Sequence, residues 1–134
     1  MPYDSRRHRV LLYGGLAGGA LGDTWAYDGT WWRALQLGNT RMPGRYAAGM
    51  TYDAWRDKVV LFGGHGAAYN KIFAETWEYN GGSETWTLVA GYAQGRPTPR
   101  FLSSLAYDPE RRTVVMVGGT QGWDVYFDDT WEYR

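Results

Sequence analysis

The chain has 134 residues, about the length of one domain, and its 14 Lys and Arg residues balance its 14 Asp and Glu residues. A chain without net charge has no general electrostatic attraction to nucleic acid or to an anionic membrane, so we expect neither as a partner. Because there is no Cys, disulfides, thiolate nucleophiles and Cys-ligated metals are excluded. Residues 1–9 lead into no long apolar run, so we expect no signal peptide or membrane span there, and the compartment stays open.

One pattern occurs three times along the chain. It consists of Tyr-Asp, a polar turn, an apolar run that ends in Gly-Gly, a loop, and an acidic residue followed by Thr-Trp-x-Tyr. The copies start at Tyr3, Tyr52 and Tyr107, and each has its second glycine 12 residues after the Tyr. The spacing varies only beyond the glycines, which indicates variable loops on a constant scaffold.

The middle copy predicts four antiparallel strands, at residues 45–52, 58–62, 75–79 and 85–88. Its second strand has four consecutive apolar residues, which indicates burial on both faces. The first copy has only a fragment of its first strand, and the last copy has no fourth strand, so we expect about ten strands. They would form one all-β domain, 1–134, with repeat units at about 3–44, 45–99 and 100–134.

This pattern resembles the Kelch-repeat β-propellers and is similar to the bacterial Kelch-type repeats. The matches span residues 3–134, and the resemblance implies that each unit is a propeller blade whose first strand lies nearest the central axis. Residues that recur in the units are expected to serve the scaffold, with each arginine pairing with an acidic residue. They are Gly14, Gly15, Gly63, Gly64, Gly118, Gly119, Trp25, Trp77, Trp131, Arg45, Arg100, Asp23, Glu75 and Asp129.

Three units are too few to close a ring, because propellers have about four to eight blades. The two end units would then leave apolar strand residues open to water, within 10–12 and 114–116. We therefore expect self-association, with a homodimer that completes a six-bladed ring as the favoured form. A larger assembly, or a truncated propeller fragment without its own activity, is the alternative.

The loops after the glycine pairs, at residues 16–22, 65–74 and 120–128, differ in length and composition, so they are where an individual site would lie. Their aromatic, amide and charged side chains suit stacking on a sugar or contact with a protein loop. Packing across a subunit junction is the alternative role for the aromatic residues. The candidate ligand-binding residues are His65, Tyr69, Asn70, Lys71, Gln121, Trp123, Asp124 and Tyr126.

The resemblance favours a non-enzymatic module for protein or carbohydrate recognition, because Kelch propellers mostly present loops for binding. A sugar-modifying enzyme of the mutarotase or lyase type is the alternative, although no histidine is clearly paired with the loop carboxylates. His8 and His65 are expected at opposite ends of the strands, so we expect no metal site and no cofactor. The basic cluster at residues 6–9 is expected to be a solvated hairpin tip.

Overall fold

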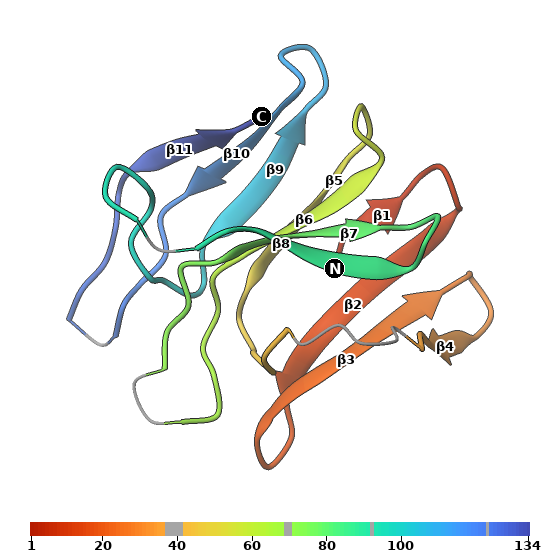
Figure 1. Ribbon diagram of the computed structural model, residues 1–134, viewed down its shortest axis with the longest axis horizontal. Helices are drawn as coiled ribbons and strands as arrows, with labels where there is room; N and C mark the ends of the chain where they lie inside the picture. Colours follow the sequence, from red (N-terminus) through yellow and green to blue (C-terminus); the bar gives the residue numbers. More distant parts are fainter. Residues whose placement is uncertain (37–41, 69–70, 92, 123) are drawn as a thin grey trace.

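The computed structural model describes residues 1–36, 42–68, 71–91, 93–122 and 124–134, and this part of the chain contains eleven strands and no helix. The strands form three antiparallel sheets that follow one another along the chain (Figure 1). The predicted all-β class is therefore confirmed. Accordingly, the described residues include no helix that is long and apolar enough to cross a membrane.

The first sheet has four strands, namely β1 (Tyr3–Asp4), β2 (Arg9–Leu16), β3 (Ala20–Tyr27) and β4 (Trp32–Ala34). The second sheet also has four: β5 (Gly49–Asp53), β6 (Lys58–Phe62), β7 (Thr76–Asn80) and β8 (Thr85–Ala90). The third sheet has three: β9 (Ser104–Asp108), β10 (Thr113–Val117) and β11 (Thr130–Tyr133). Figure 1 shows the second sheet (yellow-green) between the first (red-orange) and the third (blue).

The structure has one strand more than the ten predicted, and the additional strand is β1 of the first sheet. Tyr3 pairs with Val10 and Asp4 pairs with Arg9, so the short N-terminal fragment does form an inner strand. The glycine-rich loop expected at 16–22 is also shorter than predicted. β2 and β3 continue past a bulge at the glycine pair and leave only residues 17–19 as the turn.

The inner strand of the second sheet is shorter than the 45–52 predicted for it. Ala47 has a left-handed φ of 54°, which breaks the extended backbone, so β5 begins only at Gly49. Tyr46 instead makes an isolated bridge to His65. Leu102 holds the corresponding position before β9 and has a φ of 58°.

The repeated Tyr-Asp has a local explanation in the turn that follows it. The Asp53 carboxylate accepts hydrogen bonds from the amides of Trp55 and Arg56, both at 3.0 Å. The Asp108 carboxylate does the same in the third sheet. A side chain that satisfies turn amides stabilises the hairpin, which explains why an Asp ends each inner strand.

Two apolar clusters fill the spaces between the sheets. We call the packing of the first sheet on the second the first junction, and that of the second on the third the second junction. Leu11 and Tyr13 pack in the first junction with Leu61, Tyr79 and Trp86. The second junction contains Phe62, Ala74 and Met116, with Leu105 and Trp131 against them. All four residues from Val59 to Phe62 are buried, as their uninterrupted apolar run predicts.

The glycine pairs let the main chains of successive sheets approach closely. Gly14 has a φ of 67° and Gly63 a φ of 68°, a conformation that residues with a Cβ rarely adopt. A Cβ at these positions would lie 2.2 Å from the Arg45 carbonyl oxygen and 2.3 Å from the Arg100 carbonyl oxygen. The amide after each glycine donates to the same oxygen, at 3.0 Å and 2.9 Å. Glycine is therefore required at both contacts between sheets.

Candidate functional site

A buried arginine organises the loop end of the second sheet. The Arg45 guanidinium donates to the Glu75 carboxylate at 2.7 Å and to the Gly63 carbonyl at 3.0 Å. Glu75 also accepts the Trp77 indole N–H at 2.8 Å. The Phe73 ring lies 3.9 Å from the guanidinium carbon, so the cation is held by an anion, a carbonyl and an aromatic face together.

The third sheet repeats this arrangement. Arg100 is buried, forms an ion pair with Asp129, donates to the Gly118 carbonyl at 3.1 Å and lies 3.9 Å from the Phe127 ring centre. The Trp131 indole N–H donates to Asp129 at 2.6 Å. In the first sheet the Trp25 indole makes the same bond to Asp23, also at 2.6 Å.

The two paired carboxylates are held in the ionised form. Burial raises the pKa of Glu75, but hydrogen bonds from Arg45 and Trp77 outweigh it and leave the pKa below its ordinary value. The hydrogen bond from Arg100 likewise lowers the pKa of Asp129. A general acid or base works best with a pKa near the operating pH, so these carboxylates are better suited to fixing the loops than to proton transfer.

His65 packs against two aromatic side chains at the loop end. Its ring stacks on Tyr46 with centroids 5.0 Å apart and meets Phe101 edge-on at 5.3 Å. Its main chain exchanges two hydrogen bonds with Tyr46, each 2.9 Å long. Thr120 makes the equivalent main-chain pair with Phe101, so His65 occupies a position of the repeat.

The remaining candidates present polar and aromatic groups to solvent. Lys71, Gln121 and Asp124 are exposed, and Tyr126 is 74% exposed. The Lys71 ammonium lies 5.4 Å from the Phe73 ring centre. Thr120 is buried and donates its hydroxyl to the Val125 carbonyl at 2.7 Å, which shapes the loop that carries Tyr126. The other three candidates, Tyr69, Asn70 and Trp123, lie outside the described residues.

At the opposite end of the sheets, the expectation of a solvated hairpin tip holds for Arg6 and His8, which are exposed in the turn, and is wrong for Arg7 and Arg9. The Arg7 guanidinium makes two bonds of 2.7 Å to Asp57 in the second sheet. Arg9 is buried and donates to Glu84 at 3.0 Å and to the Tyr79 hydroxyl at 3.3 Å. These arginines join the first sheet to the second.

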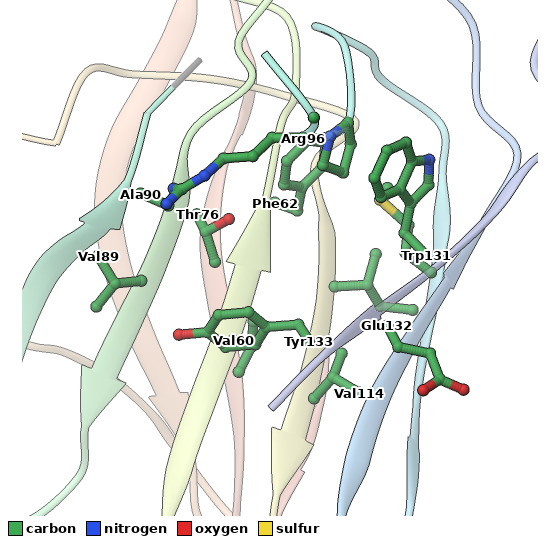
Figure 2. Close-up of a pocket in the computed structure, with 14 residues that line it drawn as sticks. Val60, Phe62, Thr76, Val89, Ala90, Arg96, Val114, Trp131, Glu132 and Tyr133 are labelled. Carbon is green, nitrogen blue, oxygen red and sulfur yellow. The ribbon is translucent and has the colours of Figure 1, made fainter. Parts of the chain in front are cut away.

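A groove of about 400 Å³ lies in the second junction. Figure 2 shows Val60 and Thr76 from the second sheet facing Val114, Trp131 and Tyr133 from the third. Arg96 reaches over the groove from the segment after β8. Most of the lining residues are apolar, and the polar side chains are those of Thr76, Arg96, Glu132 and Tyr133.

The described residues hold no group of three or more His, Asp and Glu side chains arranged to bind a metal ion. A scan against protein-family models gives no match to the chain, and a search of curated proteins finds no similar sequence.

Proposed function

We propose that this chain is an arc of a Kelch-type β-propeller that self-associates and acts as a non-enzymatic assembly and binding module. Three observations support the propeller fold: the threefold sequence repeat, the three consecutive antiparallel sheets and the glycine contacts between them. Two chains would supply six sheets, within the range of about four to eight blades in propellers.

The main observation for self-association is that each end sheet repeats a surface that is buried inside the chain. In the first sheet, Leu12 and Trp25 face away from the second sheet and are only partly buried. Their repeat counterparts, Leu61 and Trp77, are buried in the first junction. The open face of the first sheet therefore carries the chemistry of a junction surface.

The third sheet presents the other half of such a surface. Val117 is 48% exposed on the face that points away from the second sheet. Its repeat counterparts, Tyr13 and Phe62, are buried at 6% exposure in the first and second junctions. The sequence led us to expect that residues 114–116 would be open to water. That expectation is wrong for Val114 and Met116, which face the second sheet and are buried.

Burying these faces would release substantial free energy. Trp32 is 45% exposed on the open face of the first sheet, next to Tyr27 at a ring distance of 5.1 Å. The exposed part of one indole is worth about 2–3 kcal/mol at about 25 cal/mol per Å². Several such side chains would together offset the entropy cost of association, which is at least about 4 kcal/mol.

In the ring, the loop end would form the recognition surface for a protein or a carbohydrate. Tyr126 and the polar side chains of Lys71, Gln121 and Asp124 are exposed there, which suits stacking and hydrogen bonding. Two of the three recurring carboxylates, Glu75 and Asp129, are engaged by arginines, so we assign this surface to binding and not to catalysis.

Sedimentation velocity at several protein concentrations tests the assembly. We expect a dimer that dissociates on dilution, whereas a 15.2 kDa monomer at every concentration would contradict the proposal. Leu12→Lys and Val117→Lys should each abolish association, since each places a charge in one open face. Leu16→Lys is the matched control, because Leu16 is 64% exposed near the turn of the β2–β3 hairpin.

Mixing the two disabled variants gives a sharper test. The Leu12→Lys chain keeps an intact third sheet, and the Val117→Lys chain keeps an intact first sheet. A mixture should therefore recover a heterodimer with one intact junction, while each variant alone stays monomeric. If the mixture remains monomeric, the two faces do not meet each other.

A further inference from the structure

The third sheet has an open outer edge. In the first sheet β4 covers β3, and in the second sheet β8 covers β7. β11 is the corresponding strand of the third sheet, and among the described residues no strand pairs with its outer edge. The N–H and C=O groups along such an edge can pair with an additional strand.

The first junction shows what a covering strand supplies. Trp86 lies on β8 opposite Tyr79 and is only 5% exposed. Its indole N–H donates to the Thr24 hydroxyl at 3.1 Å, and its ring meets the Tyr13 ring edge-on at 5.5 Å. The covering strand thus places one indole between two sheets.

The second junction contains residues equivalent to those around the Trp86 indole, but among the described residues no indole lies between them. By repeat position Thr76 corresponds to Thr24, Phe62 to Tyr13 and Tyr133 to Tyr79, and all three line the 400 Å³ groove beside β11. The space left near Thr24 in the first junction, where Trp86 is present, is only about 160 Å³. The groove therefore lies where the second junction lacks an inserted indole.

We propose that this groove binds an extended segment of another polypeptide, which pairs with β11 and inserts a tryptophan beside Phe62, Thr76 and Tyr133. This is strand addition to a sheet edge, with main-chain bonds for affinity and a side-chain pocket for specificity. The Thr76 hydroxyl accepts the indole N–H, as Thr24 does in the first junction. The exposed Arg96 at the groove favours a segment that also carries an acidic residue, because Glu132, the other charged lining residue, is already paired with Arg111.

A second copy of this chain is not the favoured occupant. Its Trp86 is already buried between its own sheets, and its Trp32 lies on β4, which is paired with β3. Freeing either strand would break an existing sheet. A separate segment has no such cost, so the proposal does not depend on ring formation and can fail or succeed independently of it.

The probe is a fluorescein-labelled peptide with the sequence of residues 83–91, which contains the natural covering strand. Fluorescence anisotropy should show saturable binding, and replacing the peptide tryptophan by alanine should weaken it by at least about tenfold. Amide hydrogen exchange should show new protection in β11 when the peptide is bound. Absence of binding at millimolar peptide, or binding without protection of β11, would overturn the proposal.

Two adjacent variants of β8 locate the binding surface. Val89 lines the groove and is 41% exposed, whereas Leu88 is 49% exposed and does not line it. Val89→Arg should abolish peptide binding and Leu88→Arg should retain it, with thermal unfolding used to confirm that both fold. Equal binding by both variants contradicts the site. If Val89→Arg also prevents self-association and the peptide dissolves the assembly, the groove belongs to a second copy and the proposal is wrong.

Discussion

Replacing Gly63 by alanine tests the contact between successive sheets. A Cβ at Gly63 would lie 2.3 Å from the Arg100 carbonyl oxygen, well inside van der Waals distance, so the two sheets must move apart. The left-handed φ of 68° adds roughly 1–2 kcal/mol of strain for a residue with a Cβ. Overpacking costs about 1–3 kcal/mol, and the weakened amide–carbonyl bond about 1 kcal/mol. These three contributions give an expected total loss of about 3–6 kcal/mol.

The matched control is Gly118, which has nearly the same φ of 66° but no following sheet against it. A Cβ there would lie 3.2 Å from the Phe127 carbonyl oxygen, within the same repeat unit. Gly118→Ala should therefore cost only the conformational strain of about 1–2 kcal/mol. Urea unfolding followed by tryptophan fluorescence, at one protein concentration, measures both changes. If Gly118→Ala destabilises the protein as much as Gly63→Ala, the contact between sheets is not what requires the glycine.

Two further predictions concern side chains at the first junction. Trp86→Ala should lower the free energy of unfolding by about 3–5 kcal/mol because Trp86 is buried and hydrogen-bonded, whereas Trp31→Ala, at 75% exposure, should change it by less than about 0.5 kcal/mol in the same urea assay. The hydrogen bond from Arg7 lowers the pKa of Asp57 to about 2, whereas the pKa of Asp in an unfolded chain is near 4. The ionised Asp57 therefore stabilises the folded state above pH 4, and this contribution to the free energy of unfolding is lost as the pH falls towards 2. Thermal melting from pH 6 to pH 2 should show a steeper loss for the wild type than for Asp57→Asn, and parallel curves would contradict the assignment.

Features set by local chemistry or by the repeat could be predicted from the sequence. The apolar run from Val59 to Phe62 indicated a strand buried on both faces, and the structure has β6 at the predicted residues. The glycine pairs indicated unusual backbone conformations, which Gly14 and Gly63 adopt. These properties depend on a few neighbouring residues, so a single sequence is enough to reveal them.

Features that depend on the packing of one sheet on another could not be predicted. Arg7 was read as a solvated residue because its partner, Asp57, is 50 residues away and belongs to another sheet. The packing of His65 against Tyr46 and Phe101 was likewise hidden in the sequence, because Phe101 belongs to the next repeat unit. The sequence indicated only three strands within residues 100–134, but the groove at Thr76 appears only once the first junction is compared with the second.

The contact between consecutive sheets has a consequence for how such chains can change length. The contact joins the main chain of a glycine pair to a carbonyl oxygen of the next sheet, so it needs no particular side chain on the other sheet. A duplicated or deleted segment of about fifty codons could therefore keep this main-chain contact, while the side chains packed between the sheets and pairs such as Arg7 with Asp57 would need to adapt.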